Sequence, residues 1–176
     1  MQKVSVEGII LDLLTNAPVL ILKNEKGKVL PISIGIFEAY AILAVFEKTS
    51  IQKRPLTHDL IKKLINSLSA EFLRLEIHSL KNGVYYANLI ISTGNKQQKI
   101  DCRPSDGIAV ALRFQGDIFV ADNLLEETLS VTYGKGTKFF KTARSDAPIS
   151  EAEAENMRKT LDSMSAEEFW KEIMEK

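Results

Sequence analysis

The sequence predicts an α+β fold, in which helices pack over a mainly antiparallel sheet and a C-terminal helical appendage follows. Short apolar runs with period-two alternation, separated by turn residues, are typical of antiparallel strands. Two strands, a turn, a third strand and an alanine-rich helix occur twice, with Ala39 and Ala41 matching Ala109 and Ala111. This indicates an internal duplication of a strand-hairpin-strand-helix unit. After residue 150 the pattern becomes that of amphipathic helices.

The first unit begins with three predicted strands, at Val4–Leu14, Val19–Leu22 and Val29–Ile34. Turn residues at 15–18 and 24–28 separate them. Gly35 then begins a helix that extends to about Lys48, and its apolar residues surround most of its circumference. We therefore expect this helix to be buried on most sides. Glu38 is the only charge in its first half. An exit to the surface, an interaction with the dipole at the helix N-terminus or a place in a functional site would each explain it.

Between the two units, Thr57 is the expected N-cap of a second helix, with His58 and Asp59 in its first turn. Its apolar residues recur at helical spacing, and the intervening lysines lie on the opposite face. We expect the apolar face to lie on the core: Leu60, Ile61, Leu64, Ile65 and Leu68.

The second unit begins with a hairpin over Glu71–Ile91. A two-residue Asn82–Gly83 turn would place apolar residues on opposite faces, so a three-residue loop of residues 81–83 is predicted, with Gly83 left-handed in a bulge. His78 would then lie across from Tyr86 on the outer face. The predicted apolar pairs are Leu75 with Leu89 and Ile77 with Ala87.

Charged residues gather where the next strand ends and a buried helix begins. The strand is predicted at Lys96–Cys102 and the helix at Ser105–Phe114, followed by a strand at Ile118–Ala121. The exposed N–H groups of a helix start favour anions. The charged residues there, Asp101, Arg103 and Asp106, have the chemistry to serve a phosphodiester or a divalent metal. They are equally able to cap the helix and pair with one another, with Arg103 bridging the two carboxylates.

Composition places the chain among ordinary globular proteins, with 45% hydrophobic and 26% charged residues. The longest apolar run, Ala39–Phe46, is too short to span a membrane, and the N-terminus lacks a signal-peptide pattern. The single cysteine, Cys102, excludes an intramolecular disulfide and suits a reducing compartment, so we expect a cytoplasmic protein without a membrane segment.

The charge is unevenly distributed along the chain. Residues 1–149 carry 19 Lys and Arg against 15 Asp and Glu, whereas residues 150–176 carry 4 against 8. We expect three parts: an α+β domain over residues 1–132, a basic and aromatic linker over 133–149, and acidic amphipathic helices over 150–176. A basic body is compatible with nucleic acid as a partner.

The linker places Lys135, Lys138 and Lys141 among Phe139 and Phe140. Basic residues mixed with aromatics are able to follow a phosphate backbone while stacking bases, although a plain linker that covers a core edge explains them as well. The apolar stripe of the C-terminal helices must dock on the body or on a second subunit, because short isolated helices are marginal. A homodimer is therefore expected.

Four segments, in order along residues 3–130, resemble the bifunctional nuclease family of bacteria and plants. In chain order they are Leu30–Gly35 with Glu38 downstream; Arg54–Leu60; Ile77–Leu80 followed by Tyr85–Ala87; and Arg103-Pro104-Ser105-Asp106 with its alanine-rich helix. The resemblance implies cleavage of RNA and DNA.

Phosphodiester hydrolysis without zinc usually depends on carboxylates that hold Mg²⁺ or Mn²⁺, or on a histidine base. Two histidines and one cysteine exclude a His- or Cys-rich zinc site. A nuclease would use Asp101 and Asp106 as metal ligands with Glu38 as a third, Arg103 for the scissile phosphate, and His58, oriented by Asp59, as base or proton donor. Lys135, Lys138 and Lys141 would contact the substrate. The alternative is a non-catalytic binding or regulatory module that acts as a homodimeric scaffold.

Overall fold

The computed structural model describes residues 1–11, 17–46, 54–94, 96–126 and 139–141. By its internal contacts the chain divides into two units, Met1–Thr142 and Ala143–Lys176, and all described residues belong to the first. The expectations for the turn at 15–16, for the basic residues Lys135 and Lys138, and for the helices of 150–176 lie outside the described residues.

In the described part of the chain, eight strands form one sheet in the order β3-β2-β1-β7-β4-β5-β6, with β8 also pairing with β1. Every pairing is antiparallel except that of β4 with β7. The strands are β1 Gln2–Leu11, β2 Pro18–Asn24, β3 Val29–Ser33, β4 Ala70–Lys81, β5 Val84–Thr93, β6 Lys96–Cys102, β7 Asp117–Val120 and β8 Phe139–Lys141. The helices are α1 Ile36–Leu43, α2 Thr57–Ser67 and α3 Pro104–Phe114, and a 3₁₀ turn, η1, covers Asp122–Leu124.

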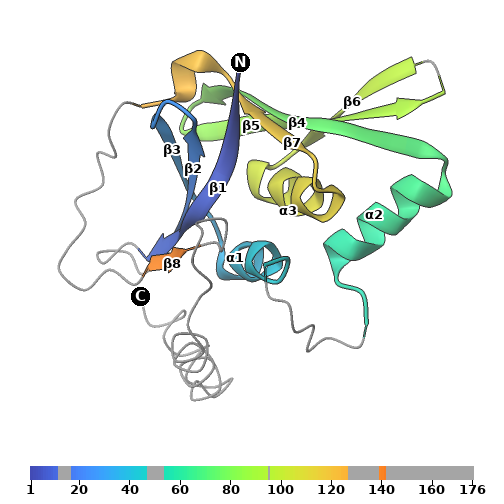
Figure 1. Ribbon diagram of the computed structural model, residues 1–176, viewed down its shortest axis with the longest axis horizontal. Helices are drawn as coiled ribbons and strands as arrows, with labels where there is room; N and C mark the ends of the chain where they lie inside the picture. The colour runs from blue at the N-terminus through green and yellow to red at the C-terminus, as the bar shows by residue number, and fades with distance from the viewer. Residues whose placement is uncertain (12–16, 47–53, 95, 127–138, 142–176) are drawn as a thin grey trace. The chain divides into compact units, whose positions relative to one another are not determined.

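The predicted α+β fold and its repeated unit are present in this topology. The order β1, β2, β3, α1 recurs as β4, β5, β6, α3, and β7 lies between β1 and β4 in the sheet. Figure 1 shows the three helices on the same side of the sheet, and α3 packs against both α1 and α2 as well as on β4 and β5. The main core fills the space between the helices and the sheet, and α3 contributes its most deeply buried helical side chains.

A glycine allows α3 to lie unusually close to the sheet. A Cβ atom on Gly107 would collide with the Leu75 side chain of β4 and would stand 3.0 Å from Cys102 Sγ. Because a larger residue here would force the buried Leu75 side chain to shift, Gly107 sets the depth at which the first turn of α3 lies. The charged residues of that turn are therefore held at the edge of the core.

The β4–β5 hairpin has the predicted face pairs but not the predicted loop. Leu75 pairs with Leu89 and Ile77 with Ala87, as expected. The turn, however, contains only Asn82 and Gly83, both with positive φ (51° and 77°), as a type I′ turn requires. The extra residue lies in the strand instead. A register shift between Ile77 and Ser79 leaves His78 in a bulge, and Ser79 rather than His78 pairs with Tyr86.

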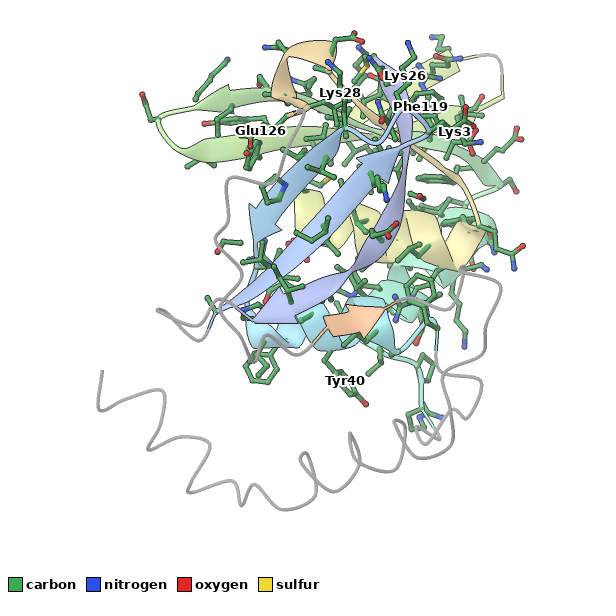
Figure 2. All side chains as sticks on the ribbon, turned by 60° about the vertical axis from the view of Figure 1, so that its left-hand side comes forward. Lys3, Lys26, Lys28, Tyr40, Phe119 and Glu126 are labelled. Carbon is green, nitrogen blue, oxygen red and sulfur yellow. The ribbon has the colours of Figure 1, made fainter. Side chains whose placement is uncertain are left out.

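The helices α1 and α2 are less buried than their sequences predict. The helical residues of α1 end at Leu43, and Ile36, Phe37 and Tyr40 are exposed. Figure 2 shows the Tyr40 side chain projecting outward at the lower edge of α1. Residues 47 and 48, where that helix was expected to end, lie outside the described residues.

The helix α2 is rotated relative to the prediction, because only one edge of its wide apolar face reaches the core. Ile65 is buried and Ile61 packs against the core. The remaining apolar stripe is exposed, namely Leu60, Leu64 and Leu68. The helix also has Leu56 rather than Thr57 as its N-cap, and Thr57 is its first helical residue. The Asp59 carboxylate, at the third helical position, accepts a hydrogen bond from the N–H of the N-cap residue Leu56 (2.8 Å), as the acidic residue of a capping box does.

Candidate functional site

The first turns of the three helices meet at one cluster of charged side chains. Glu38 is the third residue of α1, His58 the second of α2 and Asp106 the third of α3, while Arg103 is the N-cap of α3. The sequence predicted all four as site residues, and the structure brings these four together. We call them the helix-start cluster.

Asp106 is the centre of the helix-start cluster. Its Oδ2 accepts a hydrogen bond from Arg103 Nε (2.7 Å), and its Oδ1 lies 3.2 Å from both Arg103 Nη2 and His58 Nε2. Arg103 Nη2 also lies 2.9 Å from Glu38 Oε1. Arg103 therefore bridges Asp106 and Glu38, and not Asp106 and Asp101 as the sequence suggested.

The contact with Asp106 defines the chemistry of His58. Because an ionised carboxylate only accepts hydrogen bonds, His58 donates from Nε2. In the neutral imidazole, Nδ1 is then the proton acceptor. His58 is buried, whereas 32% of the Asp106 side chain and 66% of the Arg103 side chain remain exposed. The guanidinium is thus the part of the cluster most open to solvent.

Two members of the cluster, Asp106 and Arg103, have pKa values that are shifted so as to favour their charged forms. Partial burial raises the pKa of Asp106, but hydrogen bonds from Arg103 and His58 outweigh it and bring that pKa below its ordinary value of 3.8. The hydrogen bond to Asp106, and then the nearby Glu38 carboxylate, raise the pKa of Arg103. Near neutral pH, Asp106 is therefore an anion and Arg103 a cation. The helix starts favour the carboxylates.

Asp59 belongs to a second cluster, and its carboxylate accepts hydrogen bonds from Arg113 and the Leu56 N–H rather than from His58. Its Oδ1 accepts a 2.5 Å hydrogen bond from Nε of Arg113, in the last turn of α3. Arg113 Nη1 also donates to the carbonyl oxygens of Ala41 in α1 and Ala109 in α3, both at 2.9 Å. Burial raises the pKa of Asp59, but the bonds from Arg113 and the Leu56 N–H more than compensate and lower it. The carboxylate that contacts His58 is that of Asp106.

The other predicted site residues lie apart from the helix-start cluster. Asp101 is exposed on β6, where it is paired in register with Asn88. Its neighbour Cys102 faces α3, so strand alternation turns Asp101 to the opposite face of the sheet. Lys141 is the last residue of β8, and its side chain, like Lys135 and Lys138, is outside the described part of the structure. Burial raises the pKa of the Cys102 thiol to about 11, which makes it an unreactive core residue.

The geometry does not fit the predicted metal site. Across the described residues, no group of three or more His, Cys, Asp or Glu side chains is placed to hold a metal ion. Asp101 is turned away from Glu38 and Asp106, and both Asp106 oxygens already accept hydrogen bonds from cations or the imidazole. Mg²⁺ is held by oxygen ligands, usually one or two carboxylates together with water and substrate phosphate, but the predicted set of three carboxylates, Glu38, Asp101 and Asp106, is not assembled around one point.

Arg113, which connects the three helices that carry the cluster, was not identified from the sequence as a residue of the site. It is the only charged side chain between Asp106 and Asp117, in a segment that is otherwise almost entirely apolar. Glu38 was identified as a candidate site residue because it is the only charge in the first half of an apolar helix. The same criterion applied to α3 identifies Arg113, whose side chain is only 6% exposed.

The fold and the cluster define an α+β protein with a His–Asp–Arg arrangement where three helices begin. The model of the bifunctional nuclease domain family matches residues 20–132 of this chain. An uncharacterized protein of Mycobacterium tuberculosis strain H37Rv is 36% identical over 171 residues, which cover 96% of this chain and 98% of that protein. Its counterpart in strain CDC 1551 gives the same values. The resemblance seen in the sequence is therefore confirmed: the chain belongs to the bifunctional nuclease domain family.

A plant protein is also similar over part of the chain. Bifunctional nuclease 1 of Arabidopsis thaliana is 29% identical over 100 residues, or 54% of this chain and 31% of that protein. Among the described helices, none combines the length and the apolar character needed to cross a membrane.

Proposed function

We propose that this protein is a nuclease that hydrolyses phosphodiester bonds in RNA and DNA, with the helix-start cluster as its active site. The observation that carries the proposal is the contact between His58 and Asp106, next to the exposed Arg103 guanidinium, in a chain of the bifunctional nuclease domain family. A base, a carboxylate that orients it and a cation for the phosphate lie within one network. These are the parts that a hydrolytic site needs.

Each residue has a distinct role in the proposed reaction. Arg103 binds the non-bridging phosphate oxygens, and its charge is maintained by the two carboxylates beside it. His58 takes a proton from the attacking water at Nδ1, while Asp106 holds the ring in that tautomer and stabilises the imidazolium. A P–O bond forms to the water oxygen as the ester P–O bond breaks, and the leaving oxygen takes a proton from solvent. Glu38 holds Arg103 in position.

The proposal extends to the substrate and to the assembly. The substrate is nucleic acid, and Lys135, Lys138 and Lys141 add phosphate contacts from outside the cluster. The active form is a homodimer in the cytoplasm. The exposed leucines of α2 support the dimer, because a row of large apolar side chains on a surface is typical of interfaces.

Cleavage of labelled single-stranded RNA and DNA by purified protein tests the activity, in parallel reactions with Mg²⁺, Mn²⁺ or EDTA. A general base contributes about 10²–10⁴-fold, so His58→Gln should lose at least about a hundredfold in kcat. His78→Gln is the matched control, since it changes the other histidine, which lies in the β4 bulge. Arg103→Gln should weaken substrate binding, whereas Arg74→Gln, on β4, should not. Equal cleavage by His58→Gln and wild type would show that the cluster is not the site.

A second candidate function is a non-catalytic nucleic-acid-binding module. It is favoured by the saturation of Asp106, whose two oxygens are both engaged, and by the burial of His58. This function predicts salt-dependent binding of RNA or DNA with no cleavage by any preparation, and a loss of binding in Arg103→Gln but not in His58→Gln.

A further inference from the structure

The helix α2, which carries His58, has few apolar contacts to hold it in place. Of the four apolar side chains of α2, only those of Ile61 and Ile65 pack on the core, and the side chain of the C-cap residue Leu68 is exposed as well. Helix position is normally set by an apolar stripe several residues wide. Two side chains on neighbouring turns leave the axial position and the rotation of α2 poorly defined, so other contacts must fix where His58 lies.

Arg113 supplies those contacts through both its side chain and its backbone. Its guanidinium donates to Asp59 in α2, and its own backbone carbonyl accepts a hydrogen bond from Lys62 Nζ, also in α2 (both 2.5 Å). Lys62 also lies over the Phe114 ring, 5.3 Å from its centroid. The last turn of α3 therefore binds α2 at two successive turns.

The contacts of Arg113 and His58 act on neighbouring residues of α2. His58 contacts Asp106 at the start of α3, and the next residue, Asp59, contacts Arg113 two turns further along the same helix. Two such contacts, well separated along α3, determine both the rotation and the position of the α2 start. Arg113 Nη1 also binds the Ala41 carbonyl, one turn beyond Glu38 in α1. One buried guanidinium thus connects all three helices whose first turns form the cluster.

We propose that Arg113 is a positioning residue that, through Asp59, holds His58 in contact with Asp106. Its catalytic consequence rests on the function proposed above, but the positioning itself does not. Without the guanidinium, the start of α2 is free to rotate or slide on Ile61 and Ile65, and the His58–Asp106 contact weakens. Arg113 touches no substrate; it acts only through the placement of α2.

The test measures the His58–Asp106 contact directly by NMR of the full-length, ¹⁵N-labelled chain. The readout is the change in the His58 ring ¹⁵N shifts that Asp106→Asn produces, with His78 as an internal reference. We expect this change to fall at least twofold when Asp106→Asn is combined with Arg113→Met or with Asp59→Asn. Arg113→Lys, which keeps the charge but not the planar fork, should retain more of it than Arg113→Met. Arg74→Met is the matched control, because Arg74 pairs with Glu76 on its own strand, β4 (2.7 Å).

The outcomes separate the two proposals. A full-sized change in Asp59→Asn and in a folded Arg113 variant overturns the positioning role. If Arg113→Met does not fold, Arg113→Lys and Asp59→Asn decide the question. If wild-type protein cleaves nucleic acid, Arg113→Lys should lower kcat at least tenfold and leave KM within twofold. If it does not cleave, the nuclease proposal fails, while the NMR result still confirms or refutes the role of Arg113.

Discussion

The two arginines that bracket α3 make the same kind of contact in opposite environments, and their removal should have different costs. Arg103 pairs with Asp106 and Glu38 with 66% of its side chain exposed, whereas Arg113 pairs with Asp59 with 6% exposed. An exposed pair contributes at most about 1 kcal/mol, since water and salt screen it. Removal of one partner of a buried pair costs about 3–5 kcal/mol.

We therefore expect Arg103→Met to lower the free energy of unfolding by about 1 kcal/mol. Arg113→Met also deprives two carbonyls of a donor, but Asp59 is 39% exposed and regains water, so we take the lower end of the buried range, about 3 kcal/mol. At roughly 2–4 °C per kcal/mol for a chain of this size, the two midpoints should differ by about 4–8 °C.

Urea and thermal unfolding, followed by far-ultraviolet circular dichroism, measure both variants against wild type. Raised salt should shrink the cost of Arg103→Met and leave that of Arg113→Met nearly unchanged, because only the exposed pair is screened. Equal costs for the two variants, or a larger cost for Arg103→Met, would refute the reasoning. The expected result leaves Arg103 available for function, since stability depends little on it.

Three further predictions concern the same framework. Gly107→Ala should destabilise the protein by up to about 2 kcal/mol, because overpacking against Leu75 costs about 1–3 kcal/mol and the gain in helix propensity returns about 1 kcal/mol. Urea unfolding measures this change, and a stabilised variant would mean that α3 is free to move off the sheet. The free energy of unfolding should fall as the pH drops from above 3.8 through the lowered pKa values of Asp59 and Asp106, since these carboxylates stabilise the fold only when ionised. A pH series of denaturant titrations measures this dependence, and Asp106→Asn should flatten it. Asn82→Ala should cost about 1–2 kcal/mol because residue 82 has a φ of 51°, while Asn82→Gly should be nearly neutral; equal melting temperatures would argue against the two-residue turn.

The β4–β5 hairpin shows what strand patterning can and cannot predict. Alternation identifies the apolar face, so the Leu75–Leu89 and Ile77–Ala87 pairs were predicted correctly. It also requires one extra residue between the two strands. It does not say whether that residue enlarges the turn or bulges from a strand, because both restore the same faces. The structure has the bulge at His78, which permits the favourable Asn-Gly turn.

The site was predictable as a set of residues but not as a set of contacts. Glu38, His58, Arg103 and Asp106 could be identified because each is a polar residue in the first turn, or at the cap, of a helix. Their partners depend on the rotation of α2, which its sequence leaves open. Five apolar residues cover too wide an arc to select one orientation. The structure places Ile61 and Ile65 inward, which turns His58 toward α3 and leaves Leu60 outside.

This rotation places a histidine on the buried face of α2, in line with Ile61 and Ile65, where an apolar residue would satisfy the packing. A polar residue at a position where packing favours an apolar one is expected at functional sites. The loss of one hydrogen bond to Asp106 in His58→Met costs about 1–1.5 kcal/mol. The burial of the apolar methionine side chain stabilises the fold by about the same amount or slightly more. We therefore expect the free energy of unfolding to stay within about 1 kcal/mol of wild type, while cleavage is abolished. A loss of more than about 3 kcal/mol would instead identify the His58–Asp106 pair as a buried structural tie of the kind that is costly to break. Denaturant unfolding of His58→Met, with His78→Met as its control, thus decides whether the polar group at this position serves the fold or the chemistry.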